Sequence, residues 1–577
     1  MILSNLDWYI ICAYFLFTLC VGIWISKNTV TDTKSFFLAG KNIPWWLLGI
    51  SMVATTFSTD TPNLVTGLVR QHGVSGNWVW WAFLLTGMLT VFVYARLWHR
   101  TGLLTDIEFY ELRYGGKAAS FLRGFRALYL GLVFNVLVIG AVSLAAVKFG
   151  EIVLGIPGWS MLFLSCSVTL VYSTLGGIKA IIITDFIQFI LAMIGSVWAM
   201  IYILCLPQIG GISNLISHSD VAEKLSMIPD FSNPNIWIPT LFIPLAVQWW
   251  ASYYPGSEPG GGGYIAQRML SAKDERNAIG ATLLFNIAHY AIRPWPWILV
   301  ALSSLVIFPE VSDIQKTFPN LALDKLGDDV AYPAMLTLLP SGLLGLVSAS
   351  LIAAFMSTIS TQLNLGSSYI VNDFYHRFIN PTALQPELVL VGRLFTILSI
   401  FIGGGLGLIL TNATQAFNLL LMLGAGTGLI YILRWFWWRI NAYTEIIAMI
   451  SSLLVTLYFN FVWIELADWL KIIFGTIITT CIWLIGTYIT PPESESTLKK
   501  FVLKVNPGGP GWKRFYDNIS YKKWPVPIGI MMMVLGSFSV YGILFGIGQF
   551  IYGQYYLGLS LFLFSLTSSI LLFKLWK

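Results

Sequence analysis

The chain has 577 residues, of which 56% are hydrophobic and 10% are charged. Soluble domains carry about 25% charged residues, so this composition excludes a water-soluble globular protein. The net charge of +6 reflects lysine and arginine gathered in a few loops between apolar segments, not an acidic partner. The composition therefore predicts an all-α, polytopic membrane protein.

Fifteen segments are apolar enough to form membrane-spanning helices, which need about 20 mostly apolar residues each. In chain order they are 6–26, 44–69, 78–99, 121–150, 159–176, 179–205, 236–254, 276–307, 341–373, 389–411, 413–437, 442–462, 466–490, 525–547 and 555–576. Basic loops follow the first, third and thirteenth segments, whereas the loop at 308–340 is acidic. Because basic loops stay on the cytoplasmic side, this pattern predicts an integral plasma or inner membrane protein with its N-terminus outside and its C-terminus inside.

Two of these segments are unsuited to regular helices. The segment 44–69 carries Asp60 and Pro62, and the segment 236–254 continues into the run PGSEPGGGG at 255–263. Irregular backbone at membrane depth occurs where it lines a cavity or is buried in protein. Two interrupted helices five spans apart are typical of an inverted repeat of five plus five helices. A cytoplasmic loop at 255–263 is the alternative interpretation.

This repeat would divide the chain into four parts. An extra N-terminal helix and loop occupy 1–43, the two halves of the repeat occupy 44–205 and 206–437, and extra C-terminal helices occupy 438–577. The last part includes a basic cytoplasmic loop at 491–524. No Gly-Lys-Ser/Thr follows the glycine run, and the sequence has neither metal-ligand spacing nor a nucleophile beside a base. We therefore do not expect an enzyme.

Four stretches resemble motifs of the sodium:solute symporter family, which includes the sodium/glucose cotransporters. They are FFLAGKNIPWW (36–46), STLGGIKAIIITDFIQF (173–189), YIAQRMLSAKD (264–274) and AAFMSTISTQLNLGSSYIVNDFY (353–375). The resemblance implies a LeuT-type fold and uptake of a small organic solute with sodium by alternating access. Sugars and related polyols are favoured. A carboxylate or other organic anion is the alternative, and a channel or a sensor is a remote one.

The resemblance also sets the expected partners, which are sodium as the coupling ion, the solute and the lipid bilayer. No organic cofactor, nucleic acid or obligate protein partner is indicated. The chain departs from the family pattern at Gly262 and Gly263, where members often carry Asn-Gln. It also lacks the acid of span 3 and the lysine of span 8 that sugar-transporting relatives use. The substrate of this chain is therefore not inferred from the substrates of those relatives.

A first sodium site is implied by the resemblance. It places the backbone carbonyls of Ala54 and Phe57 opposite the carbonyl of Ala354 and the hydroxyls of Ser357 and Thr358. Oxygen ligands from unwound backbone suit sodium, because they replace its water shell. Serine and threonine also occur in membrane helices merely to allow close packing, which is the alternative.

A second sodium site is suggested by helix geometry. Ser357, Ser360 and Thr361 lie on one side of the same helix, at about 100° per residue. In some family members an acid faces such hydroxyls, and the matching acid here is Asp185. A lone acid within a span needs a partner, and a cation supplies one. Alternatively, Asp185 bonds these hydroxyls without an ion or pairs with Lys179.

Candidate solute-binding residues come mainly from charges and aromatic rings within the spans. Asp60 either caps a half-helix or contacts the solute. His289 and Arg293 share one helix face, and Arg293 either clamps a carboxylate or holds the structure together. Trp249 and Trp250 either stack on a ring of the solute or lie at the membrane interface. The full candidate set is Asp60, Thr61, Trp249, Trp250, Tyr264, His289 and Arg293.

Overall fold

The computed structural model describes residues 3–26, 32–319, 321, 323–410, 426–516 and 524–576. Regular structure in these ranges is helical, apart from one isolated parallel bridge between Ile43 and Ala272. The α-helices are α1 (Asn5–Ser26), α2 (Thr33–Leu38), α3 (Trp45–Thr55), α4 (Asp60–His72), α5 (Trp78–Trp81), α6 (Leu84–Leu89), α7 (Ala95–Thr101), α8 (Phe109–Arg113), α9 (Gly116–Leu128), α10 (Asn135–Phe149), α11 (Gly158–Leu204), α12 (Ile212–Ser217), α13 (Ser219–Ala222), α14 (Pro234–Trp237), α15 (Trp249–Ala251), α16 (Gly263–Ser271), α17 (Glu275–Ile287), α18 (Pro294–Ile307), α19 (Val311–Thr317), α20 (Ala331–Leu336), α21 (Leu343–Ser368), α22 (Gln385–Ile409), α24 (Gly428–Leu433), α25 (Ala442–Phe461), α26 (Asp468–Ile489), α27 (Glu495–Val505), α28 (Val526–Ile551) and α29 (Tyr555–Trp576).

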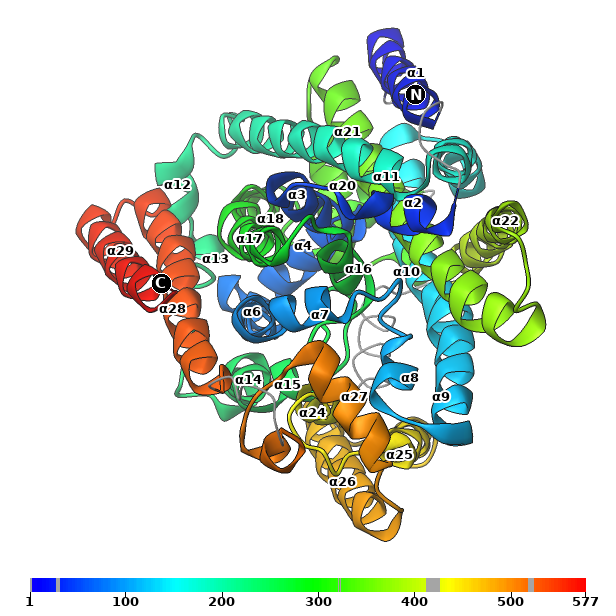
Figure 1. Cartoon of the computed structure of the whole chain (residues 1–577). Coiled ribbons are helices and arrows are strands. Elements are labelled where there is room, and N and C mark those ends of the chain that lie inside the picture. Colours follow the sequence, from blue (N-terminus) through cyan, green and yellow to red (C-terminus); the bar gives the residue numbers. More distant parts are fainter. Residues whose placement is uncertain are drawn as a thin grey trace.

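Several of these helices continue through π-helical turns. The turns are η3 (Thr90–Tyr94), η4 (Tyr129–Phe134), η5 (Gly150–Leu154), η6 (Ile238–Phe242), η7 (Pro244–Gln248), η8 (Ala288–Ile292) and η11 (Tyr369–Ile379). In Figure 1, α3, α4, α16, α17 and α18 lie at the centre of the bundle, with the longer helices α11, α21 and α10 around them. The first interrupted segment, formed by α3 and α4, is thus enclosed by protein.

Eleven helical stretches within the described residues are long and apolar enough to cross a membrane. They correspond to eleven of the fifteen predicted spans. Of the other four, 44–69 and 236–254 are irregular, and 159–176 is continuous with the next predicted span in α11. The last, 413–437, falls largely on residues 411–425, which lie outside the described residues.

The first interruption separates α3 from α4. The hydroxyl of Thr56 hydrogen-bonds back to the carbonyls of Met52 and Val53, at 3.2 and 2.8 Å, as α3 ends. Helix α4 then restarts with Asp60 and Pro62 in its first turn. Proline is tolerated there because its missing N–H would have no helical partner, and an acid is favoured by the helix dipole. Asp60 and Pro62, which made the predicted span 44–69 irregular, thus lie in the first turn of its second helix.

The second interruption runs from Ser252 to Gly262, between α15 and α16. Gly256, Gly260 and Gly261 have positive φ angles of 82°, 74° and 75°, which residues with a Cβ rarely adopt. A Cβ on Gly260 would lie 2.5 Å from the carbonyl oxygen of Tyr431. The segment is therefore buried against α24, which favours an interrupted helix over a solvated loop.

The predicted segments 159–176 and 179–205 meet at a sharp kink in α11. Gly177 has φ 57° and ψ −162°, a conformation that requires glycine. A Cβ there would lie 2.7 Å from the carbonyl oxygen of Phe36, so the α2 region packs directly on the kink.

The C-terminal hairpin of α28 and α29 lies at the edge of the bundle (Figure 1). Its glycines allow close approach: a Cβ on Gly529 would lie 2.6 Å from Val93 Cγ2, and one on Gly536 would lie 3.0 Å from Met88 Sδ. Tyr541 also donates a hydrogen bond to the carbonyl of Trp81 at 2.9 Å. Small residues at such contacts are typical of helix packing in membranes.

Candidate functional site

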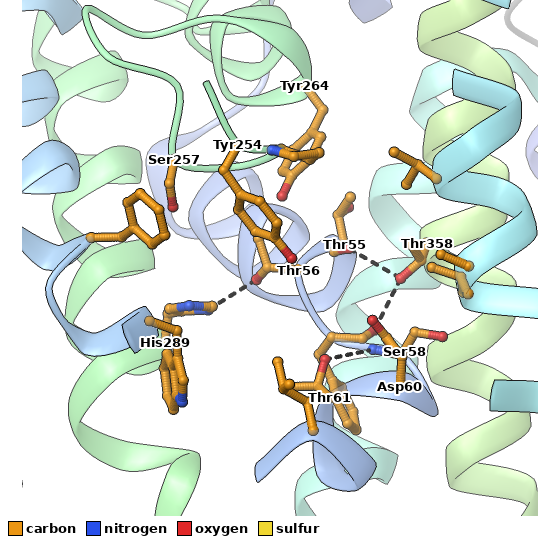
Figure 2. A pocket seen from close by; sticks show the side chains of 18 of the residues that line it. Thr55, Thr56, Ser58, Asp60, Thr61, Tyr254, Ser257, Tyr264, His289 and Thr358 are labelled. Atoms are coloured by element: carbon orange, nitrogen blue, oxygen red, sulfur yellow. Dashed lines mark hydrogen bonds between the residues drawn. The ribbon is translucent and has the colours of Figure 1, made fainter. Parts of the chain in front are cut away.

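A cavity of about 140 Å³ lies where the two interrupted helices meet. Figure 2 shows residues of the first interruption facing Tyr254 and Ser257 of the second across this space. Helices α5, α10, η8 and α21 contribute further lining residues. The lining residues are Thr55, Thr56, Phe57, Ser58, Asp60, Thr61, Leu64, Trp80, Phe83, Val138, Ala141, Val142, Tyr254, Pro255, Ser257, Tyr264, His289, Tyr290, Arg293, Thr358 and Gln362.

Five of the seven predicted solute-binding residues line this cavity, namely Asp60, Thr61, Tyr264, His289 and Arg293. Trp249 and Trp250 are not among the described residues that line it. Their indole N–H groups donate to the carbonyls of Leu245 and Ala246 on their own helix, at 2.9 and 2.8 Å. The structure thus brings the first five together and places the two tryptophans elsewhere.

The guanidinium of Arg293 holds the end of α3. Its Nη1 donates to the carbonyl of Val53 at 3.1 Å, and its Nη2 donates to the carbonyl of Thr56 at 2.9 Å. The same group lies over the rings of Phe57 and Trp297, at 5.8 and 5.4 Å from their centroids. Carbonyls at a helix C-terminus lack helical partners and carry partial negative charge, so a cation stabilises them. Arg293 thus supports the interruption, and within the described residues its guanidinium hydrogen-bonds Val53 and Thr56, not Asp60.

His289 lies within the π-helical turn η8, a feature often found at functional sites. Its Nδ1 lies 3.1 Å from Thr56 Oγ1, as Figure 2 shows. The ring packs edge-on against Trp80, with 5.6 Å between centroids. The imidazole therefore connects the first interruption to the aromatic wall of the cavity.

Sequence reasoning missed several lining residues. Trp80 and Phe83 contribute aromatic faces, and Phe83 stacks on Tyr254 with 5.6 Å between centroids and 14° between planes. Ser58 Oγ is buried and has no hydrogen-bond partner among the described residues. Tyr254 and Ser257 belong to the irregular segment that the sequence had marked, so its position could have suggested them. Trp80 and Phe83 carried no such signal.

The structure brings several residues of the first predicted sodium site close together. The hydroxyl of Thr358 lies 3.0 Å from the carbonyl oxygens of both Thr55 and Phe57, across the interruption. The Ala54 carbonyl accepts the N–H of Phe57 at 3.3 Å. Ala354 is buried one helical turn before Thr358. These oxygens are neutral and close together, which suits a hard cation such as sodium.

The remaining predicted ligand of that site, Ser357, hydrogen-bonds to Asp185. Its hydroxyl donates to Asp185 Oδ1 at 2.6 Å, and Ser51 donates to Asp185 Oδ2 at 2.5 Å. Ser360 donates to the carbonyl of Ser357 at 2.9 Å, within its own helix. Asp185 thus contacts the predicted hydroxyl face through Ser357, whereas Ser360 donates to its own helix and lies beside the Tyr172 hydroxyl.

The positively charged side chain of Arg268, which the sequence analysis did not single out, lies beside Asp185. Nη2 of Arg268 lies 3.6 Å from Asp185 Oδ2 and donates to Thr361 Oγ1 at 2.7 Å. Both charged side chains are fully buried. Within the described residues, Asp185 therefore pairs with Arg268 and not with Lys179. A second sodium ion at Asp185 stays a prediction. Arg268 was visible in the motif YIAQRMLSAKD as a charge beside the interruption.

Comparisons with known proteins agree on one family. The model of the sodium:solute symporter family matches residues 36–452. A sodium/glucose cotransporter of Vibrio parahaemolyticus is 28% identical over 481 residues, covering 80% of this chain and 86% of that protein. The human sodium/myo-inositol cotransporter 2 is 26% identical over 504 residues, covering 80% of this chain and 70% of that protein.

Among solved structures, the outward-open state of a sodium-coupled sialic acid symporter superposes with a TM-score of 0.64 at 19% identity. The match covers 85% of this chain and 99% of that one. This likeness shows the fold alone. The chain belongs to the sodium:solute symporter family and is a sodium-coupled membrane transporter with the LeuT-type fold, not an enzyme.

Proposed function

We propose that this transporter imports a sugar or a related polyol together with sodium. The observation that carries the proposal is the lining of the central cavity. Hydroxyl, amide and imidazole groups from Thr56, Ser58, Ser257, His289 and Gln362 share its surface with aromatic rings. A polyol offers many hydroxyls to such groups and C–H faces to the rings. The names of the relatives point the same way, since they include glucose, mannose and myo-inositol cotransporters.

The anionic alternative depended on Arg293. Two of its guanidinium nitrogens already donate to carbonyls at the end of α3. A carboxylate would have to compete with these hydrogen bonds, which hold the interruption in shape. We therefore favour a neutral solute.

The coupling ion is proposed to bind at the first interruption. Its ligands would be the carbonyls of Ala54, Phe57 and Ala354 with the hydroxyls of Ser357 and Thr358. A potential of 100 mV contributes about 2.3 kcal/mol per charge and a tenfold sodium gradient about 1.4 kcal/mol. One sodium ion per solute could then support accumulation of roughly 500-fold.

The test is uptake by proteoliposomes that contain the full-length protein. Labelled glucose, mannose, myo-inositol and a carboxylated sugar are offered under sodium, lithium, potassium or choline gradients. We expect sodium-dependent uptake of at least one neutral sugar or polyol, accelerated by an inside-negative potential because net charge enters. Protein-free liposomes give the background. Uptake confined to the carboxylated sugar, or equal uptake in all four salts, would contradict the proposal.

A further inference from the structure

A second, much smaller cavity lies beside the central one, at the glycine-rich segment between α15 and α16. Its volume is about 10 Å³, which is room for one water-sized particle. Glu258 lines it together with the threonines Thr86, Thr90 and Thr282. Ser257 lines both cavities, so the two spaces are separated by little more than one residue.

Glu258 contributes a buried carboxylate to this cavity. It is only 4% exposed, its Oε2 has no hydrogen-bond partner, and no ion pair to it is found within the described part of the chain. A neighbouring acid adds negative charge: a Cβ on Gly262 would lie 3.2 Å from Glu258 Cβ and 3.6 Å from Asp106 Oδ2. A buried charge without a partner costs several kcal/mol. The carboxylate therefore requires a cation or a proton.

Two arginines of this region have other partners. Arg434 pairs with Glu445 at 3.4 Å, and Arg126 donates to the hydroxyl of Tyr110 at 3.0 Å. Residues 411–425, which precede α24, include no lysine or arginine. Within the described residues, neither arginine forms an ion pair with Glu258.

The threonine hydroxyls can offer the cavity only lone pairs. Thr90 donates its hydrogen to the carbonyl of Thr86, and Thr282 donates to the carbonyl of Ala278, both at 2.9 Å. Thr86 donates to the carbonyl of Trp249. With all three hydrogens used, the hydroxyl oxygens are acceptors beside a carboxylate that accepts from the backbone of Gly256 and Glu258 but whose Oε2 has no partner among the described residues. A proton on Glu258 would satisfy one of these oxygens, whereas a cation attracts all of them.

The backbone is shaped around the carboxylate. A Cβ on Gly263, whose φ is 52°, would lie 2.5 Å from Glu258 Oε1. Glycine at that position therefore makes the room that the carboxylate occupies.

We propose that Glu258, with Thr86, Thr90 and Thr282, binds one dehydrated sodium ion beside the solute cavity. This ion is separate from the one at the interruption between α3 and α4. Hard cations take carboxylate and neutral oxygen ligands of this kind, and the cavity admits a single ion without its water shell. Because Ser257 contacts both spaces, filling one affects the shape of the other. The inference rests on the sodium coupling of the family and not on the identity of the solute.

The experiment is equilibrium binding of radioactive sodium to the purified full-length protein, with no solute present. We expect Glu258→Gln to bind one equivalent fewer than the unmodified protein and Thr358→Ala to lose the other equivalent. Glutamine has the shape of a protonated glutamate. Equal sodium binding by Glu258→Gln and the unmodified protein would therefore show that Glu258 carries a proton, and would overturn the proposal.

A second variant keeps the test valid if Glu258→Gln folds poorly. Thr282→Val preserves the volume of the side chain and removes one ligand, so the Glu258 site should bind sodium about tenfold more weakly. Thr169→Val is the matched control, because Thr169 is equally buried and donates to its own helix at Ser165. Identical sodium binding by these two valine variants would contradict the site. Without solute in the assay, failure of the sugar proposal would not affect the result.

Discussion

Thr358 donates its hydroxyl toward two carbonyl oxygens at the first interruption. If these oxygens bind sodium, Thr358→Ala removes one ligand and about 1.5–3 kcal/mol of binding free energy. We expect the sodium concentration for half-maximal uptake to rise about 10- to 100-fold. Ser350→Ala is the control, because Ser350 lies on the same helix and donates to the carbonyl of Val347. An unchanged sodium requirement in Thr358→Ala would remove this residue from the site.

Arg293 allows the two explanations of its charge to be separated. Because it holds carbonyls at the end of α3, Arg293→Gln should reduce the uptake of every solute and raise the sodium requirement about tenfold. Arg100→Gln, which breaks an ion pair with Glu275, serves as the control and should transport normally. Loss of carboxylated solutes alone in Arg293→Gln would instead indicate that the guanidinium binds the solute.

At this scale, buried charge was the useful signal in the sequence. Asp60 and Arg293 were found because charged groups within spans are costly and therefore functional or paired, and His289 was found because it shares a helix face with Arg293. Which of these alternatives holds depends on contacts that the sequence does not encode locally. Arg293 meets Val53 across 240 positions of the chain. Uncharged lining residues such as Phe83 could not be told from ordinary packing.

At the scale of elements, the ion pair of Asp185 and Arg268 joins α11 to α16. Removing one partner leaves a buried charge uncompensated, so Asp185→Asn and Arg268→Gln should each destabilise the protein by about 3–5 kcal/mol. The double variant should recover most of that loss. Thermal unfolding of the detergent-solubilised variants measures it. The exposed pair Glu495 and Lys499 is the control pair, because its loss should cost less than about 1 kcal/mol. Equal stability of all three variants would contradict this prediction.

The same variants examine the second sodium predicted at Asp185. That prediction requires a sodium Hill coefficient above one that falls to one in Asp185→Asn. The Glu258 site requires the fall in Glu258→Gln instead. A coefficient above one that falls in Glu258→Gln but persists in Asp185→Asn would leave Arg268 as the cation of Asp185.

The helix interruptions were predictable because proline and glycine disrupt helices by their own chemistry. The direction in which a side chain points was less predictable. Trp249 and Trp250 follow the π-helical turns η6 and η7, which change the rotation of the helix before these residues. A helical wheel with a constant angle per residue cannot place them. Hydropathy likewise marked α28 as a span but not its packing, which depends on small residues fitting together.

At the scale of the whole molecule, the orientation inferred from basic loops can be tested by labelling. In a variant without the five native cysteines, Ser219→Cys should react with an impermeant maleimide on intact cells, because its loop is predicted to lie outside. Ser496→Cys, also exposed, should react only after permeabilisation. Labelling of Ser496→Cys on intact cells would reverse the orientation or change the number of spans.

The bonds of Arg268 also bear on how the transporter changes conformation. One guanidinium connects α16 to Ser51 on α3, to Asp185 on α11 and to Thr361 on α21. These helices can separate only if Arg268 breaks its bonds to all three of them at once. A guanidinium or carboxylate that lost only some of its partners would remain buried in apolar surroundings. The separation of α16 from α3, α11 and α21 should therefore be all-or-none. Such a step favours an occluded intermediate and limits the leak of sodium when no solute is carried.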